Sequence, residues 1–411
     1  MSEWLRCIRC GKEFDAGAIR YTCDCEGLLS VERDAPSVGP SVFDSRRDRA
    51  TGIDRSGVWR FREAVLDVAC ESIVTHPEGS TRMYEREGIF FKHEGENPTG
   101  SFKDRGMTVA VTQAMRLGSR AVACASTGNT SASLAAYAAQ AGLKAIVFVP
   151  AGKVSAGKLA QTLAYGARTL LVRGGFDDCL RLVQEASERL GVYLLNSINP
   201  FRLEGQKTIV LELLQQLGWD PPDWIVLPAG NLGNTAAFGK AIREAHAWGL
   251  IGRRPRLAAV QAAGAAPFAR SFEEGFRQRY RVEPETVATA IRIGDPASHD
   301  RAVRAIRETD GVVLAVSDAE ILEAKAAVDA CGVGCEPASA ASIAGVRTLV
   351  RRGTIPSGAR VVAVLTGHVL KDPGMLLQYH VETDPPPSGA NRPVEIEADL
   401  REVERELTKE T

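Results

Sequence analysis

The sequence predicts an α/β protein built of two open, twisted α/β units that share a cleft, preceded by a small cysteine-rich segment. Short apolar runs alternate with longer helical segments across most of the 411 residues, a rhythm typical of mostly parallel sheets. Nine of these runs resemble strands, which is more than one ordinary sheet of this kind holds, so we expect two sheets. Four of the nine cysteines fall within the first 25 residues and mark the separate segment.

Each strand is expected where a β-rich apolar run is followed by a polar or glycine-containing turn. The nine expected strands are 89–93, 121–126, 145–150, 169–172, 192–196, 224–230, 256–261, 312–316 and 361–367. The longer segments between them predict helices. These expected helices are 129–141, 176–190, 205–217, 234–249, 318–331 and 338–352.

Composition excludes several classes of protein. The net charge of -1 gives no basic field for nucleic acid or an anionic membrane. The longest apolar runs, such as "KAIVFVPAG", are shorter than a membrane-spanning helix requires. The N-terminus "MSEWLRCIRC" lacks the order of charge and apolar residues of a signal peptide. We therefore expect a cytoplasmic protein that acts on a small molecule.

The first cysteines form two short pairs, Cys7 with Cys10 and Cys23 with Cys25. Four thiolates in a closed tetrahedron are the usual ligands of structural zinc. Gly27 follows the second pair, where a tight turn is needed. The sequence predicts a zinc ribbon; the alternative is four free thiols on a small hairpin. The remaining cysteines, expected mostly in the core, are Cys70, Cys124, Cys179, Cys331 and Cys335.

A glycine loop follows the expected strand at 224–230. In "PAGNLGNTAAFG", Gly230 and Gly233 allow close approach of the backbone to an anion, and a helix from Asn234 directs its first amides there. A phosphate suits such a loop. A dinucleotide suits it less well, because the third glycine is misplaced and the next strand ends in Gln261. A glycine turn without a ligand is the alternative.

Hydroxyl groups gather after the strand at 121–126. The segment "STGNTSAS" places Ser126, Thr127, Thr130 and Ser131 around the amide of Asn129, at the start of a helix. Amides and hydroxyls in this arrangement bind a carboxylate or a phosphate. Simple capping of the helix by Ser or Thr is the alternative interpretation.

The segment "TGHVLKDP" follows the last expected strand. Its Thr366 hydroxyl is placed to meet a neutral ring nitrogen. His368 resembles a candidate base, but a histidine just beyond a strand is more often a packed or hydrogen-bonded loop residue, and we favour that interpretation.

Lys103 lies in "TGSFKDRG", at the start of an expected helix. A reactive lysine, a phosphate-binding loop and a partner for a ring nitrogen are what pyridoxal phosphate requires. The lysine amine can form an imine with the cofactor's aldehyde. We therefore predict that Lys103 is the Schiff-base lysine.

These segments together resemble one enzyme family. The segments "ENPTGSFKDRGM", "STGNTSAS", "NSINPFRLEGQKT", "PAGNLGN", "EPASAAS" and "TGHVLKDP" occur in the family's order. On them the chain is similar to the threonine synthases, of the tryptophan-synthase-β-like superfamily of pyridoxal phosphate enzymes, from the cysteine ribbon to about residue 375. Three positions depart from the family pattern: Arg82, His93 and Val369.

The resemblance implies roles for the cofactor-binding residues. Lys103 would hold the cofactor and move protons, Asn129 would hydrogen-bond the ring hydroxyl, and Thr366 would face the pyridine nitrogen. The residues implied to surround the cofactor phosphate are Gly230, Asn231, Leu232, Gly233 and Asn234.

The resemblance also implies a substrate, O-phospho-L-homoserine, which a lyase converts with water to L-threonine and phosphate. Ser126, Thr127 and Thr130 match positions that contact the substrate's carboxylate or phosphate ends, and Asn196 and Arg202 match positions that bind its phosphate. The alternatives are a cysteate synthase-like paralogue that uses phosphoserine and sulfite, a serine or threonine dehydratase, and a catalytically silent protein that only binds the cofactor.

The expected domains follow from these assignments. We expect the zinc ribbon over residues 1–32, a linker and leading helix over 33–75, and the catalytic region over 76–375, with its smaller subdomain roughly over 115–190. A C-terminal tail over 376–411 would carry an acidic helix. We expect a homodimer.

Overall fold

The computed structural model describes residues 3–152 and 156–409. The chain forms two compact units, Met1–Lys371 and Asp372–Thr411. Each unit is described by itself. The described helices include none that is long and apolar enough to cross a membrane.

The first unit contains a six-stranded sheet in the order β12-β11-β10-β13-β5-β4. Its strands are β4 (Met83–Arg86), β5 (Ile89–His93), β10 (Trp224–Pro228), β11 (Arg256–Ala262), β12 (Val312–Val316) and β13 (Val361–Leu365). All neighbours pair in parallel except the edge strand β4, which is antiparallel to β5. The central strands β10 and β13 are apolar and buried throughout, as expected of parallel strands covered on both faces.

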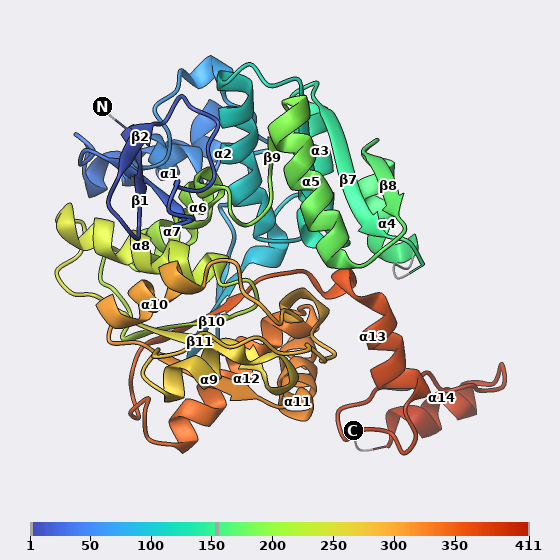
Figure 1. The fold of residues 1–411 in the computed structure, drawn as a ribbon. Coiled ribbons are helices and arrows are strands. Elements are labelled where there is room, and N and C mark those ends of the chain that lie inside the picture. The colour runs from blue at the N-terminus through green and yellow to red at the C-terminus, as the bar shows by residue number, and fades with distance from the viewer. Residues whose placement is uncertain (1–2, 153–155, 410–411) are drawn as a thin grey trace. The chain divides into compact units, whose positions relative to one another are not determined.

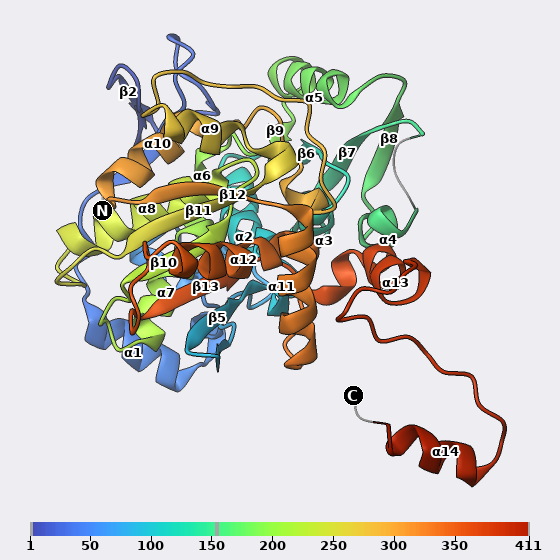
Figure 2. The ribbon, with the colours of Figure 1, turned by 90° about the horizontal axis from the view of Figure 1, so that it is seen from below.

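The two faces of this sheet carry different helices because strand side chains alternate with a period of two. Trp224 and Val226 pack with α11 (Asp318–Ala330) and α12 (Pro337–Arg351) (Figure 2). Ile225 and Leu227 belong to the core of the opposite face. The helices that contribute to that opposite core include α6 (Pro200–Gln206), α7 (Thr208–Gln216), α8 (Gly233–Ala247), α9 (Pro267–Glu273) and α10 (His299–Glu308).

A second, four-stranded parallel sheet has the order β8-β7-β6-β9. Its strands are β6 (Ala121–Ala125), β7 (Lys144–Pro150), β8 (Arg168–Val172) and β9 (Tyr193–Leu194). One face packs on α2 (Lys103–Arg116) and α3 (Asn129–Gln140), and the other packs on α5 (Phe176–Leu190). Figure 1 shows this sheet with α3, α4 (Ala156–Ala164) and α5 as a block distinct from β10 and β11. The two predicted sheets are therefore confirmed.

The cysteine-rich segment forms a small antiparallel sheet in the order β2-β1-β3. Its strands are β1 (Glu3–Cys7), β2 (Glu13–Asp15) and β3 (Leu29–Arg33). Leu5, Leu29 and Val31 are buried in the same core as α6 and α8. A helix that follows, α1 (Pro40–Arg49), adds Phe43 to this core. The ribbon is thus packed against the larger sheet's helices.

Buried ions also join the ribbon to the main body. Arg33 at the end of β3 donates to the Glu204 carboxylate in α6 at 2.8 Å. Lys240 of α8 and Arg301 of α10 donate to backbone carbonyls of β3. All of these cationic side chains are buried. The ribbon therefore contacts three helices of the larger half through buried cations.

Three expected helices differ in extent or type. The segment 205–217 forms two helices, α6 and α7, with Lys207 between them, and α6 begins earlier than expected, at Pro200. The leading segment 58–66 forms a 3₁₀ helix, Trp59–Ala64, rather than an α-helix. The second unit contains α13 (Pro373–Leu377) and α14 (Leu400–Leu407), so the helix of the acidic tail is short.

Candidate functional site

Lys103 is the first residue of α2. The residues before it are fixed to the end of β13. The Phe102 amide donates to the Thr366 carbonyl at 3.0 Å, and Ser101 pairs with Gly367 in an isolated β-bridge. Two distant segments, "TGSFKDRG" and "TGHVLKDP", therefore meet at Lys103, as their predicted roles require.

The surroundings of Lys103 weaken its affinity for a proton. Burial is the main cause, the charge of Arg202 acts in the same direction, and Glu336 opposes them; the result lowers the pKa of Lys103 to about 7. Its Nζ atom lies 4.1 Å from the centroid of the Phe102 ring. Near neutral pH a large fraction of the amine is therefore unprotonated, which is the nucleophilic form.

Arg202 lies in the first turn of α6 and is almost fully buried. Its Nη1 donates to the Leu195 carbonyl at 3.1 Å, while its Nε has no hydrogen-bond partner among the described residues. Burial lowers the pKa of Arg202 to about 10, with a small opposing effect of Cys124. The guanidinium is still charged at neutral pH, so a cation lies in the site with an unused donor.

The helix that carries Arg202 is held close to the helix that carries Lys103. A Cβ atom on Gly106 of α2 would lie 2.9 Å from the Arg202 carbonyl, and one on Gly205 of α6 would collide with the Arg105 carbonyl. Only glycine permits this approach of two backbones. The helix expected over 205–217 begins at Pro200, so Arg202 lies within it rather than before it. Glu204 does not pair with Arg202, because its carboxylate binds Arg33, Lys207 and Lys240.

The loop before α8 forms a cradle of backbone amides. Leu232 has φ 63°, a left-handed conformation that is rare for a non-glycine residue. The amides of Gly233 and Asn234 then open α8, where they lack acceptors within the helix. A Cβ on Gly230 would lie 2.9 Å from the Ile291 Cα, so this position has no room for a side chain.

Several buried polar atoms near this loop have no partner among the described residues. They are Asn234 Oδ1, Thr235 Oγ1 and Gln206 Oε1. A Cβ on Gly233 would lie 3.3 Å from that Gln206 oxygen, which places the atom at the loop. Both polar atoms of the Asn231 side chain make a hydrogen bond: its Nδ2 donates to Ser197 Oγ at 3.3 Å, and its Oδ1 accepts from the Ala297 amide at 2.8 Å. Buried polar atoms without partners are expected where a bound group supplies the missing hydrogen bonds.

The hydroxyl cluster lies at the start of α3, as predicted. Ser126 Oγ accepts from the Gly128 amide at 3.4 Å, and Ser131 Oγ donates to the Gly128 carbonyl at 2.8 Å. Ser131 thus serves the turn itself. Thr127 and Thr130 are half-buried beside Asn129. Ser126 and Ser131 therefore support the helix start, whereas Thr127 and Thr130 are accessible to a ligand.

Asn196 has a local role in this structure. Its Oδ1 accepts from the Ala125 amide at 3.0 Å, and its Nδ2 donates to the Ala125 carbonyl at 3.1 Å. The side chain therefore anchors the end of β6, directly before Ser126. The proposed contact of Asn196 with a substrate phosphate would use its remaining hydrogen-bonding capacity.

Thr366 is buried at the end of β13, and its hydroxyl lies 3.0 Å from that of Ser339 in α12. Each hydroxyl can accept or donate, so the pair can adapt to a ring nitrogen. His368 is half-buried and accepts from the Leu370 amide at 3.2 Å. This contact agrees with the interpretation of His368 as a loop residue.

Glu336, the first residue of the segment "EPASAAS", is a candidate site residue that its sequence context did not predict. The Asn129 Nδ2 donates to the Glu336 carboxylate at 3.0 and 3.3 Å. Glu336 is also the carboxylate whose charge acts on Lys103. The signal available in the sequence was a Glu at the start of a helix, where Ser, Thr, Asp and Asn are preferred.

A buried ionic network lies next to the site. Arg105, two residues after Lys103, binds the carboxylates of Glu94 and Glu212 at 2.6 and 2.8 Å. Glu212 also binds Lys92 at 2.6 Å and Arg60 at 2.8 Å. Burial alone would raise the pKa of Glu212, but these three cations outweigh it and hold the pKa well below its usual range.

The four ribbon cysteines come together as predicted. All four Sγ atoms lie within 4.8 Å of one another, with Cys7 and Cys25 at 3.6 Å and Cys10 and Cys23 at 3.6 Å. A Cβ on Gly27 would lie 2.6 Å from the Cys7 Sγ, so glycine keeps the group compact. Of the other cysteines, Cys70 is exposed, which contradicts its expected place in the core. The buried or half-buried ones are Cys124, Cys179, Cys331 and Cys335.

Comparison with known proteins agrees with this geometry. Residues 72–367 match the model of the pyridoxal-phosphate dependent enzyme family. The chain is 45% identical over 418 residues to a threonine synthase of Methanocaldococcus jannaschii, with 98% of each chain covered. It is 48% identical over 381 residues to a threonine synthase of Methanosarcina acetivorans, covering 90% of this chain and 92% of that one.

Solved structures share the fold. The crystal structure of threonine synthase from Escherichia coli superposes with a TM-score of 0.73 over 99% of both chains, at 19% identity. The structure of maize serine racemase covers 80% of this chain and 96% of its own, with a TM-score of 0.65 and 23% identity. At these identities both likenesses concern the fold alone. The likeness to the synthase structure extends further along the chain.

Proposed function

Because the chain belongs to the threonine synthases, within the family of pyridoxal-phosphate-dependent enzymes, we infer that it converts O-phospho-L-homoserine and water to L-threonine and phosphate. The choice of substrate rests on one observation in the site. Among the described residues, the buried Arg202 has no carboxylate partner and its Nε donor has no acceptor, and its charge acts on Lys103. A leaving group that is a phosphate dianion would satisfy that donor and that charge.

The residues of the site fit pyridoxal phosphate. The loop from Gly230 to Asn234 offers backbone amides and a helix N-terminus to the cofactor phosphate. Lys103 would hold the cofactor, Asn129 would donate to its ring hydroxyl, and Thr366 would meet its ring nitrogen. When bound, the cofactor supplies an electron sink for the carbon acids of the substrate.

The partner of the ring nitrogen limits the strength of that sink. The Thr366 hydroxyl is paired with Ser339 rather than with a carboxylate. A hydroxyl cannot hold the ring nitrogen in its protonated form as a carboxylate would. We propose that this restrains side reactions at Cα and favours elimination of the γ-phosphate.

Lys103 is suited to carry protons between substrate atoms. With its pKa lowered to about 7 by burial and Arg202, its amine can accept a proton near neutral pH and return it. We propose that it accepts the substrate's Cα proton and exchanges protons at Cβ and Cγ. Arg202 would hold the phosphate as negative charge builds on the bridging oxygen.

The substrate's other groups would meet the start of α3. Ser126, Thr127 and Thr130 are proposed to bind its carboxylate or phosphate end. Asn196, which fixes the backbone of Ala125, would support this region and contribute its remaining capacity to the phosphate.

The test is a coupled measurement on the purified protein. Phosphate released from O-phospho-L-homoserine and L-threonine formed are measured in the same reaction, and equal amounts are expected. Threonine or serine consumed with release of ammonia, without turnover of phosphohomoserine, would instead identify a dehydratase. Turnover of phosphoserine only with sulfite would identify a cysteate synthase-like enzyme, and no turnover of any of these would leave a protein that only binds the cofactor.

We also propose that Cys7, Cys10, Cys23 and Cys25 bind one zinc ion with a structural role. A tetrahedral site with Zn–S bonds of about 2.3 Å needs sulfurs about 3.8 Å apart, close to the 3.6 Å of the pairs Cys7–Cys25 and Cys10–Cys23. Four cysteines leave no open position for catalysis.

Metal analysis tests this assignment. The wild type should contain one zinc per chain, and the Cys7→Ser, Cys10→Ser double variant should contain far less. Cys70→Ser, which changes an exposed cysteine outside the group, is the matched control and should keep its metal. Equal zinc in all three proteins would refute the site.

Two expectations about the whole protein complete the proposal. Nine thiols, four of them in a metal-binding group, suit a reducing compartment, and we propose that the protein is cytoplasmic. We further propose a homodimer, for which light scattering should give a mass of about twice 44.1 kDa.

A further inference from the structure

Glu336 occupies a position that its own helix does not explain. It is the residue directly before α12, yet its side chain makes no capping hydrogen bond to that helix. Glu is not among the residues preferred there. Glu336 is 5% exposed, and its carboxylate contacts Asn129 instead, in a helix that packs on the four-stranded sheet.

The surrounding backbone is arranged to hold this carboxylate. The Glu336 amide donates to the Gly367 carbonyl at 3.0 Å. A Cβ on Gly367 would lie 2.5 Å from the Glu336 Cδ and Oε1 atoms, so a glycine is needed directly after Thr366. Glu336 is therefore held in position by Gly367, directly after Thr366, which is proposed to meet the cofactor's ring nitrogen.

The contact with Glu336 determines which way the Asn129 amide faces. An ionised carboxylate only accepts hydrogen bonds, so the NH₂ group of Asn129, and not its carbonyl, must face it. That nitrogen carries two hydrogens. Among the described residues this nitrogen donates only to the two oxygens of the Glu336 carboxylate. One hydrogen shared between those two oxygens makes both contacts, so the second hydrogen is available to another acceptor.

We propose that Glu336 is a positioning residue for the cofactor: by accepting from Asn129, it directs the second N–H of that amide to the ring hydroxyl oxygen of pyridoxal phosphate. The inference rests on the proposed role of Asn129. Without Glu336 the amide can turn by half a rotation and present its carbonyl, which repels an oxygen that carries negative charge. Glu336 also opposes the charge of Arg202 at Lys103.

The spectrum of the bound cofactor tests this role without any substrate. The visible absorbance of the ring depends on the state of its hydroxyl oxygen, and a merely structural residue would not change it. In Glu336→Gln the side chain keeps its size, but its amide can pair with either face of Asn129. We expect part of the visible band to be lost and the cofactor to be bound roughly 10- to 100-fold more weakly.

A double-mutant comparison separates positioning from a direct effect. If Glu336 acts through Asn129, Glu336→Gln should change neither the spectrum nor the cofactor affinity further once Asn129→Ala is present. The matched control is Glu323→Gln in α11, where the side chain is 78% exposed; its spectrum should equal that of the wild type.

Gly367→Ala disturbs the contact between Glu336 and Asn129 without changing either residue. Its methyl group would displace the carboxylate without removing the charge, and we expect the spectral change of Glu336→Gln. If Glu336→Gln does not fold, as judged by circular dichroism, Glu336→Asp and Gly367→Ala take its place in the same comparison.

A wild-type spectrum in Glu336→Gln would overturn the proposal. So would a Glu336→Gln substitution that lowered the visible absorbance and the cofactor affinity equally in the wild type and in Asn129→Ala. Either result can be told apart from failure of the proposed function, because phosphohomoserine turnover by the wild type is a separate measurement.

Discussion

Arg105 and Lys103 are two positions apart in α2, and their surroundings are opposite. The Arg105 guanidinium is fully buried against two carboxylates, Glu94 and Glu212. Lys103 is near a second cation, Arg202, which itself has an unused donor and no carboxylate partner among the described residues. One helix therefore takes part in two ionic groups: a completed network, in which carboxylates pair with the cation, and an incomplete one, in which the neighbouring cation has no carboxylate partner.

The comparison shows how the same type of side chain serves two purposes. A buried ion pair with all its bonds made costs much to break, because removal of one partner leaves an uncompensated charge. A buried cation left without a partner is unfavourable for stability, and it persists where a ligand completes it. The completed network holds the helix in place. We propose that the phosphate and carboxylate groups of the ligands complete the other one.

The largest effect is expected at Lys103. Lys103→Ala should lose the visible absorbance of the bound cofactor and lower turnover of phosphohomoserine on the order of 10³-fold or more, because it removes the amine proposed as the nucleophile and proton carrier. Absorbance after gel filtration and the phosphate assay check this. A variant that kept the cofactor's visible band, with no amine added, would show that another lysine holds it.

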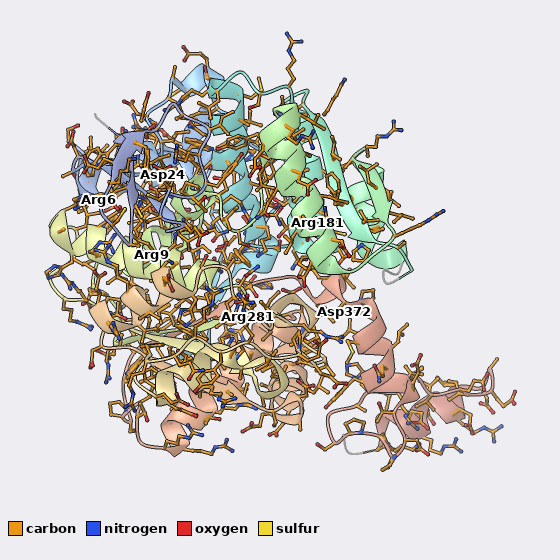
Figure 3. The ribbon with its side chains drawn as sticks, in the orientation of Figure 1. Arg6, Arg9, Asp24, Arg181, Arg281 and Asp372 are labelled. Carbon is orange, nitrogen blue, oxygen red and sulfur yellow. The ribbon has the colours of Figure 1, made fainter. Side chains whose placement is uncertain are left out.

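Breaking the completed network should affect stability rather than chemistry. Arg105→Met leaves Glu94 and Glu212 with less compensation, and the free energy of unfolding should fall by about 3–5 kcal/mol. Denaturant unfolding measures the loss. Arg181→Met is the matched control: Arg181, labelled on α5 in Figure 3, pairs with Glu185 at 2.9 Å on the surface, and its loss should cost about 1 kcal/mol or less. Equal losses would contradict the distinction between buried and exposed pairs.

Removing the unpaired cation should affect the phosphate and spare the fold. Arg202→Ala should lower kcat/KM for phosphohomoserine by roughly 30- to 1000-fold, since charge-assisted bonds in a closed site contribute about 2–4 kcal/mol to the transition state. Any slow deamination of L-threonine or L-serine should change far less, because its leaving group is hydroxide, which does not need the paired donors of a guanidinium. If kcat/KM fell equally for phosphohomoserine and for deamination, Arg202 would stabilise the fold rather than bind the phosphate.

The smallest effect concerns the protonation of Lys103. With its pKa lowered to about 7 by burial and Arg202, the amine of cofactor-free protein becomes nucleophilic as the pH rises through that value. The rate of cofactor capture should therefore increase with pH and level off above about pH 8. Arg202→Ala removes the repulsion, which raises the pKa and moves the midpoint to higher pH. Stopped-flow absorbance gives both midpoints; a midpoint that stayed in place would remove Arg202 from the environment of Lys103.

Much of the fold could be predicted because its signals are local. Every one of the nine expected strands is present, and Trp224–Pro228 is the apolar core strand that its composition indicated. The edge strand Met83–Arg86 was not predicted, because "MYER" is half polar and becomes a strand by pairing with β5. The break at Lys207 was also missed: the sequence continues helically, and no local signal marks the close packing of α6 on α2 at Gly205, just before the break.

The site shows the same division. Lys103, Asn129, Thr366 and the loop 230–234 were identified from motifs in which a lysine, an amide, a hydroxyl and glycines have chemical reasons to occur. Glu336 was not, because its importance lies in a contact with Asn129, more than 200 positions earlier in the chain. The role of Asn196 at Ala125 depends likewise on two strands that become neighbours only in the folded sheet.

The sequence by itself determined the elements and the residue types of the site: alternating strands and helices, a lysine at a helix start, a glycine loop before a helix, and four cysteines at the spacing of metal ligands. Only the tertiary structure decided which buried cations are paired with carboxylates and which are not. Arg105 and Arg202 are both arginines in helices and cannot be told apart by composition. They differ because Glu94 and Glu212 surround the first, whereas Glu204, two residues from the second, is turned to Arg33 and Lys207. Such pairing depends on which distant side chains share a buried volume, and a linear pattern does not record that.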